Sequence, residues 1–265
     1  MSVGEQARGT PWLVLPTYNE AKNIEAIVVA AASVLGEATA EDYKILIVDD
    51  GSPDGTGDIA DRLAGERTQV EVLHRSEKNG IGPAYLAGFR YALDHGAAYA
   101  MEMDSDFSHD PADLARLLAA VDRSSPGSAD LALGSRYVPG GGVTDWGLLR
   151  RFISQGGSTY ARWMLGLNVK DLTGGFKCFR REVLEAIHFD SVRSQGYAFQ
   201  VELTYRAVRA GFQVVEVPIV FKDRELGESK MSWKIAAEAM WLVPKLRFGA
   251  QPPSPATQAE LASSR

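Results

Sequence analysis

The chain has 265 residues, of which 45% are hydrophobic, and its formal net charge is −6. This size suffices for one substantial α/β core, and an acidic chain has no general attraction for nucleic acid, so we expect no nucleic-acid partner. The single cysteine, Cys178, excludes an intrachain disulfide framework and a cysteine-rich metal site.

In the first half of the chain, short apolar runs alternate with helical patterns, as is typical of a mainly parallel sheet flanked by helices. The predicted strands cover residues 12–15, 44–48, 70–74, 99–103 and 131–134. The predicted helices cover residues 23–35, 56–64, 82–94 and 111–120. In such sheets ligands bind at the carboxyl ends of the strands, so the residues that follow each strand are the candidate site.

The second half is less regular. Its predicted elements are an amphipathic stretch at 150–165, a helix at about 197–209, a strand at 214–217, a polar loop at 222–230 and a helix at about 233–248. No apolar run reaches the roughly 18 residues of a membrane-spanning helix. We expect one domain over residues 10–248, with a disordered N-terminus at 1–9 and a disordered tail at 249–265.

Two carboxylates follow the fourth predicted strand. Asp104 and Asp106 are separated by Ser105, so a turn of the backbone there would bring both to one cation. Mg²⁺ and Mn²⁺ prefer oxygen ligands and commonly complete their shell with substrate phosphates. The spacing alone is also compatible with an ordinary solvated turn.

Polar clusters also follow the first and second strands. Tyr18 and Glu20 would suit a nucleoside through ring stacking and hydrogen bonds, although a turn and a helix start explain them equally well. Of the adjacent Asp49 and Asp50, one would cap the following helix and the other would face the ligand crevice. For Asp54 and Thr56 we favour a structural role as helix caps.

Taken in order, these segments resemble the glycosyltransferase 2 family with its GT-A fold. Within that family they resemble the branch of dolichol-phosphate mannose synthases and their bacterial polyprenyl-phosphate counterparts. The matching segments are Pro16-Thr17-Tyr18-Asn19-Glu20, residues 48–56, Asp104-Ser105-Asp106-Phe107-Ser108-His109, residues 134–137, residues 171–176, residues 217–219, Asp223-Arg224 and residues 227–230. The resemblance covers about residues 11–248. It implies an α/β, Rossmann-like domain with interfacial amphipathic helices.

By position, the resemblance also implies roles for individual residues. The implied nucleotide contacts are Pro16, Tyr18, Glu20, Val48 and Asp50. Asp104, Ser105 and Asp106 are implied to lie at the pyrophosphate, with Asp104 and Asp106 as the metal ligands. Arg136, Arg224 and Lys230 are implied to contact phosphates of the donor or the acceptor. Some members carry a glutamine as a further metal contact where this chain has Ser108, so Ser108 is not counted as a ligand.

The reaction implied is transfer of mannose from GDP-mannose to a polyprenyl or dolichyl phosphate, with inversion and with Mg²⁺ or Mn²⁺ as cofactor. A phosphate monoester is largely ionised at neutral pH, so the nucleophile needs no catalytic base. Asp104, Asp106, Arg136 and Arg224 are the expected catalytic residues. The alternative donors are UDP-glucose and a UDP-N-acetylhexosamine.

A polyprenyl acceptor requires that the protein meet a membrane surface. Residues 150–165 and 231–248 both mix basic and aromatic side chains, as interfacial helices do, but helices that merely cover the sheet are amphipathic too. We expect a peripheral protein on the cytoplasmic face of the membrane, held by a membrane-anchored partner protein.

Two other function classes compete with this interpretation. A Rossmann-type oxidoreductase would need its glycine-rich run directly after the first strand, whereas Gly80 and Gly82 lie much later in the chain. A non-catalytic lipid-phosphate binding module would leave Asp104 and Asp106 without a purpose.

Overall fold

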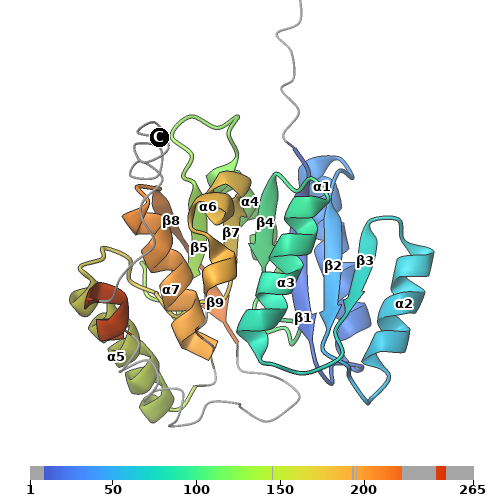
Figure 1. The fold of residues 1–265 in the computed structure, drawn as a ribbon, viewed down its shortest axis with the longest axis horizontal. Coiled ribbons are helices and arrows are strands. Elements are labelled where there is room, and N and C mark those ends of the chain that lie inside the picture. The colour runs from blue at the N-terminus through green and yellow to red at the C-terminus, as the bar shows by residue number, and fades with distance from the viewer. Residues whose placement is uncertain (1–8, 145, 193, 195, 223–242, 249–265) are drawn as a thin grey trace, which may run out of the picture.

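The computed structural model describes residues 9–144, 146–192, 194, 196–222 and 243–248. Within these residues, a seven-stranded sheet lies between two layers of helices (Figure 1). In spatial order its strands are β3 (Val70–His74), β2 (Lys44–Asp49), β1 (Pro11–Thr17), β4 (Tyr99–Glu102), β7 (Lys177–Arg180), β5 (Leu131–Ser135) and β8 (Val214–Pro218). A smaller sheet pairs β6 (Gly142–Val143) with β9 (Val220–Phe221).

The large sheet is mainly parallel. β1 pairs in parallel with both β2 and β4, so the strand order reverses there, and such a switch point is where ligands bind in open α/β sheets. β7 is the exception, because it runs antiparallel to both of its neighbours, β4 and β5.

The sheet is buried on both faces. Along β2, Ile45 and Ile47 point into one hydrophobic core, and Leu46 and Val48 point into the other. The first core is closed by α1 (Ile24–Thr39), α2 (Thr56–Glu66) and α4 (Leu114–Val121), and the second by α3 (Ile81–Asp94), α6 (Arg181–Ala186) and α7 (Gly196–Arg209). Burial on both faces explains why the strands are continuous apolar runs.

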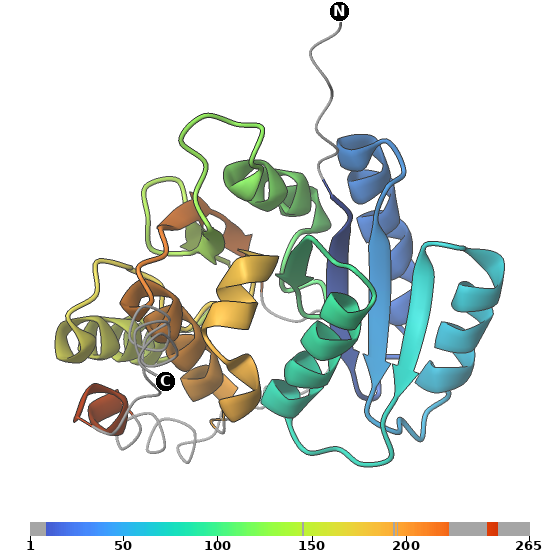
Figure 2. The same cartoon turned by 45° about the horizontal axis from the view of Figure 1, so that its top comes forward.

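A third hydrophobic cluster joins α5 (Leu148–Leu165) to the rest of the molecule. Ala161 and Leu165 of α5 pack with Val201 and Tyr205 of α7 and with Val243. Figure 2 shows α5 and the helical segment 243–248 together, on the side of the molecule opposite α2. Within the described residues, no helix is both long enough and apolar enough to span a membrane.

The expected α/β architecture is confirmed, and each strand predicted above is present. β7 was not predicted, because Lys177 and Arg180 make half of its four residues cationic. The predicted helix at 233–248 is described only from residue 243, and it is helical there. Residues 1–8 and 249–265, most of the 222–230 loop, and with it Arg224 and Lys230, lie outside the described residues.

Candidate functional site

The loops after β1, β2 and β4 converge on the end of β1. The Asp50 backbone N–H donates to the Thr17 carbonyl (3.1 Å), and the Ser105 hydroxyl donates to the Pro16 carbonyl (3.1 Å). Asp50 lies 33 residues from Thr17 in the chain and Ser105 lies 89 residues from Pro16, so two distant predicted site segments are held against the same strand end. The predicted convergence of the acidic and polar clusters on one sheet edge is observed.

The two carboxylates at the end of β2 have different partners. Asp49 accepts from the Ser52 backbone N–H (3.3 Å) just before α2. Asp50 pairs with Arg75 in the loop after β3, at 2.6 Å. Burial raises the pKa of Asp50, and the Arg75 guanidinium opposes that rise. Sequence reasoning missed Arg75, because its proximity to Asp50 depends on the β2–β3 pairing.

Asp54 and Thr56 join the β2–α2 loop to the β1–α1 loop. The Thr56 hydroxyl accepts from the Glu20 N–H (2.9 Å), and Asp54 accepts from the Ala21 N–H (3.1 Å). The N-cap position of α2 is occupied by Gly55, and an Asp54 carboxylate oxygen accepts from the Thr56 backbone N–H, the first of the helix, at 3.1 Å. The expected capping role is thus observed for the Asp54 side chain, and the hydrogen bonds of Asp54 and Thr56 also fix the shape of the loops after β1 and β2.

The Tyr18 ring lies beside a cation that the sequence did not single out. The Lys78 ammonium sits 3.6 Å from its centroid, within the range of a cation–π contact. Pro16, Tyr18 and Glu20 are all half-buried, whereas the Val48 side chain is fully buried in the core under β2. Val48 thus presents no side-chain surface to a ligand in this structure.

The Asp104–Ser105–Asp106 segment is held by its own following loop. Asp106 accepts from both the backbone N–H (3.0 Å) and the hydroxyl (2.5 Å) of Ser108. The His109 Nδ1 atom accepts from the Asp104 N–H (3.3 Å), so the neutral ring carries its proton on Nε2. Burial lowers the pKa of His109 to about 3, so the ring is neutral at physiological pH.

Asp104 and Asp106 are the candidate metal ligands. No group of three or more His, Cys, Asp and Glu side chains suited to a metal ion occurs in the described part of the chain. An oxygen-only pair of carboxylates nevertheless fits Mg²⁺ or Mn²⁺, which take remaining ligands from water and phosphate. The residues present therefore fit a cation shared with a diphosphate.

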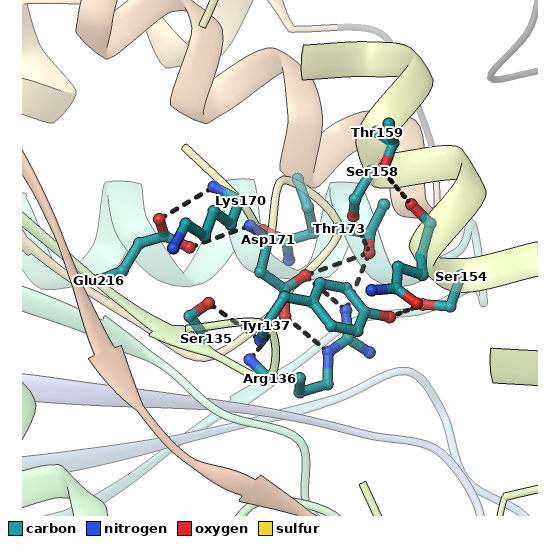
Figure 3. Close-up of polar contacts among 12 residues, drawn as sticks. Ser135, Arg136, Tyr137, Ser154, Ser158, Thr159, Lys170, Asp171, Thr173 and Glu216 are labelled. Atoms are coloured by element: carbon teal, nitrogen blue, oxygen red, sulfur yellow. Dashed lines mark hydrogen bonds and ion pairs between the residues drawn. The ribbon is translucent and has the colours of Figure 1, made fainter. Parts of the chain in front are cut away.

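Arg136, which follows β5, is engaged in a buried ion pair with Asp171 (Figure 3). Its Nε and Nη2 atoms each donate to the Asp171 carboxylate at 2.7 Å, and Nη2 also donates to the Thr173 hydroxyl at 2.9 Å. Burial opposes ionisation of Asp171, but the guanidinium outweighs it and lowers the pKa of the carboxyl. The Arg136 side chain is thereby fixed in one orientation.

A glycine-rich turn lets the chain pass close to Arg136. A Cβ atom on Gly141 would lie 2.4 Å from the Ser135 carbonyl oxygen, a distance that no side chain tolerates. The rings of Tyr137, Trp146 and Phe221 lie 5.3–5.5 Å from the guanidinium carbon of Arg136. Aromatic rings and a closely approaching glycine turn thus surround this cation.

Hydroxyl groups link the Arg136 region to α5 (Figure 3). The Tyr137 hydroxyl donates to Ser154 (2.7 Å), and the hydroxyls of Ser158 and Thr173 lie 3.2 Å apart. Glu216 of β8 accepts from the backbone N–H of Asp171 at 3.0 Å. The inner face of α5 is therefore tied to the same residues that orient Arg136.

The outer face of α5 exposes large hydrophobic side chains among polar ones. Trp163 is 78% exposed and Ile153 is 46% exposed, and Phe248 of the neighbouring helical segment is 77% exposed. A shallow depression of about 500 Å³ is lined by Trp163, Tyr160 and other residues of α5. We call this surface, formed by Ile153, Tyr160, Trp163 and Phe248, the α5 face.

The sequence of this chain is similar to one protein-family model and to two curated enzymes described below. The sequence model of "Glycosyl transferase family 2" matches residues 12–188. A curated polyprenol monophosphomannose synthase of Mycolicibacterium smegmatis is 50% identical over 87% of this chain and 84% of its own length. An undecaprenyl-phosphate mannosyltransferase of Micrococcus luteus is 49% identical over 86% of this chain and 89% of its own length.

Solved structures share the fold at low identity. A mannosyltransferase of Pyrobaculum calidifontis, in complex with GDP-Man and Mn²⁺, superposes with a TM-score of 0.61 at 18% identity, over 96% of this chain and 70% of that one. A glucosyl-3-phosphoglycerate synthase of Mycobacterium tuberculosis, in complex with Mn²⁺, UDP and glucosyl-3-phosphoglycerate, superposes with a TM-score of 0.62 at 20% identity, over 93% of this chain and 82% of that one. The GT-A-like arrangement expected from the sequence is confirmed by these similarities.

Proposed function

This chain belongs to glycosyl transferase family 2, and we propose that it transfers mannose from GDP-mannose to a polyprenyl phosphate, giving a lipid-linked mannose donor. The observation that carries the proposal is the identity of about one half, over most of both chains, with two curated enzymes that mannosylate polyprenyl phosphates. The geometry agrees. The Asp104–Asp106 loop is held to the end of β1 through Ser105 and Pro16, and the Phe221 ring contacts both His109, just after that loop, and Arg136.

The donor nucleotide is assigned to the cluster at the ends of β1 and β2. Tyr18 and Asp50 would contact the nucleoside, with Pro16 and Glu20 beside them, and Arg75 and Lys78 add positive charge there. Val48 would act only as part of the core beneath the cluster, because its side chain is buried. Asp104, Ser105 and Asp106 would lie at the diphosphate.

Arg136 is assigned to a phosphate group, with Arg224 and Lys230 as further cations in the chain. A sugar nucleotide and a phosphate acceptor bring several negative charges to one place, and the always-charged guanidinium of Arg136 supplies positive charge there. Asp171 accepts from Nε and Nη2 and holds the guanidinium in one orientation, so little side-chain entropy is lost when a phosphate approaches this charge.

The chemistry proposed is a direct displacement. An oxygen of the acceptor phosphate attacks the anomeric carbon of mannose, the bond between that carbon and the diphosphate breaks, and GDP leaves with the electron pair. The configuration inverts, and no proton has to be removed from the nucleophile. The protein aligns the two substrates, and a divalent cation at Asp104 and Asp106, when bound, would stabilise charge on the departing diphosphate.

The α5 face is assigned to the membrane surface. Exposed Trp163 and Phe248 are accompanied by the exposed cations Arg162 and Arg247, a combination that suits the interface of a bilayer with anionic lipid. Location at the cytoplasmic face of the membrane and a membrane-anchored partner protein remain part of the proposal. Tight insertion of the purified chain into vesicles without any partner would count against the partner.

The test is transfer of labelled mannose from GDP-mannose to a polyprenyl phosphate in detergent, with Mg²⁺ or excess chelator. Asp106→Asn keeps a group that can accept from Ser108 while removing the charge, and the exposed Asp94→Asn is its matched control. We expect a lipid-linked product that requires the cation, is lost in Asp106→Asn and is retained in Asp94→Asn. Product from UDP-glucose or a UDP-N-acetylhexosamine but not from GDP-mannose would overturn the donor assignment.

A further inference from the structure

The two halves of the large sheet meet where β4 pairs with β7. One half, β3-β2-β1-β4, carries the nucleotide cluster and the Asp104–Asp106 loop, and the other, β7-β5-β8, leads into Arg136 and Asp171. Four residue pairs form this seam, from Tyr99 opposite Arg180 at one end to Glu102 opposite Lys177 at the other. The Glu102–Lys177 end is the end at which the site lies.

Glu102 and Lys177 form an ion pair in the interior of the protein. Both side chains are 0% exposed, and the Lys177 ammonium lies 3.0 Å from the Glu102 carboxylate. Gln200 of α7 completes the network, because its oxygen accepts from Lys177 and its amide nitrogen donates to Glu102 at 3.3 Å. One element from each side of the seam and one covering helix are thus joined by three side chains.

A buried ion pair of this kind contributes little net stability to the fold. Taking two charges out of water costs several kcal/mol for each ion, and well-packed apolar residues in place of a buried pair are often neutral or stabilising. A charged network does specify one geometry, because any displacement leaves a buried charge without its partner. The position of the network between β4 and β7 therefore suits a role in aligning the two halves of the sheet.

The neighbouring chain segments carry the chemistry. Glu102 is followed two residues later by Asp104, and Lys177 is preceded by the turn that contains Thr173 and Gly175. A Cβ atom on Gly175 would lie 3.3 Å from the Gln200 side-chain nitrogen, so this turn rests directly on Gln200.

Helix α7 makes a second link to the same loop. Its Phe199 ring stacks on Tyr85 of α3 with 5° between the planes, and the Tyr85 hydroxyl lies 3.5 Å from an Asp104 carboxylate oxygen. Two neighbouring residues of α7 thus contact both parts of the site. Phe199 supports Asp104 through Tyr85, and Gln200 bonds the Glu102–Lys177 pair.

We propose that Glu102, Lys177 and Gln200 are positioning residues that set the distance between the diphosphate loop at Asp104 and the phosphate-binding Arg136–Asp171 pair. The inference rests on the proposed function, because it concerns how the donor half and the acceptor half of the site are aligned. Alignment acts on the reacting geometry, and a misplacement of about 1 Å can cost on the order of 100-fold in rate. Binding of either substrate alone is expected to change little.

The experiment compares wild-type protein with the double variant Glu102→Gln/Lys177→Met. This variant removes both charges at nearly constant volume, and the new amide at 102 can still bond Gln200. We expect a melting temperature within a few degrees of wild type, a GDP-mannose dissociation constant in the presence of Mn²⁺ within about threefold by calorimetry, and a kcat lower by about tenfold or more.

The matched control is Arg180→Met, at the far end of the same strand. Arg180 pairs with Asp130 at 2.8 Å, away from the site, so its loss should lower the melting temperature and leave kcat unchanged. If the double variant fails to fold, the test uses Gln200→Met, which leaves the ion pair in place. We expect the same fall in kcat for Gln200→Met, with unchanged affinity for the donor.

A folded double variant with wild-type kcat overturns the inference. An equal loss of kcat in Arg180→Met also overturns it, because general stability would then explain the effect. A double variant that loses only affinity for the donor overturns it as well. Absence of product from the wild-type protein in the same assay would instead contradict the proposed function.

Discussion

Arg136 and Asp171 form a buried, two-pronged ion pair in which both carboxylate oxygens accept from the guanidinium at 2.7 Å. The Arg136 backbone N–H also donates to this carboxylate at 2.9 Å. Asp171 is fully buried, so it cannot itself reach a ligand. Its effect on the reaction must pass through the orientation of Arg136.

We predict that Asp171→Asn destabilises the protein by about 3 kcal/mol, because removing one partner leaves a buried charge uncompensated. Urea unfolding measures this change. Because the folded pKa of Asp171 is lowered, its stabilisation is fully present above the unfolded value of 3.8 and is lost only as pH falls through the folded pKa. The loss in the variant should therefore be the same at pH 6 and pH 8.

The control for Asp171→Asn is Asp130→Asn, which breaks the partly exposed pair with Arg180. It should cost less stability and leave turnover intact. An equal loss of stability in the two variants would contradict the larger contribution expected of the buried pair.

Asp50→Asn should weaken nucleotide binding. The carboxylate is held by Arg75 at the nucleotide side of the site, and loss of its charge removes an acceptor for the base or ribose. We expect the dissociation constant for GDP to rise about tenfold, equivalent to about 1.4 kcal/mol, with a smaller change in kcat. Calorimetry with GDP measures the binding, and the exposed Asp58→Asn on α2 is the control. Unchanged GDP affinity in Asp50→Asn would remove Asp50 from the nucleotide site.

Removal of the two exposed rings of the α5 face should weaken membrane binding. Burial of such a side chain in an apolar phase is worth about 1.5–3 kcal/mol, so Trp163→Ala/Phe248→Ala should reduce vesicle affinity on the order of tenfold or more. Sedimentation with vesicles containing anionic lipid measures it. The control is Val29→Ala, since Val29 on α1 is 43% exposed and lies in a different part of the fold. Equal vesicle binding by both variants would place the membrane surface elsewhere.

His74 should make part of the stability depend on pH. Its hydrogen bond to Asp61 raises the pKa of the imidazole above its usual value of 6.5. A raised folded pKa means that the stabilisation is fully present below 6.5 and is lost as pH rises through the folded value. The melting-temperature difference between wild type and His74→Gln should therefore shrink from pH 6 to pH 8. The effect is expected to be small, because the side chain is 49% exposed. A difference that does not vary with pH would contradict it.

Some features of the site depended on contacts that local patterns do not encode. Arg75 and Lys78 were not predicted, because they reach Asp50 and Tyr18 only through the pairing of β3 with β2 and the path of the loop after β3. Likewise, the family resemblance includes the segment that contains Asp171, but the pairing of Asp171 with Arg136, 35 residues away, depends on the tertiary structure. Such contacts depend on which strands become neighbours.

The sequence by itself determined the alternation of strands and helices, the polar residues at the strand ends and the family resemblance. These follow from hydrophobic periodicity and turn chemistry, which act over a few residues. Only the tertiary structure decided that Lys177 lies in an antiparallel strand at the centre of the sheet, opposite Glu102. A lysine favours the surface in any local pattern, and it is buried here because a carboxylate 75 residues away and an amide on α7 compensate its charge.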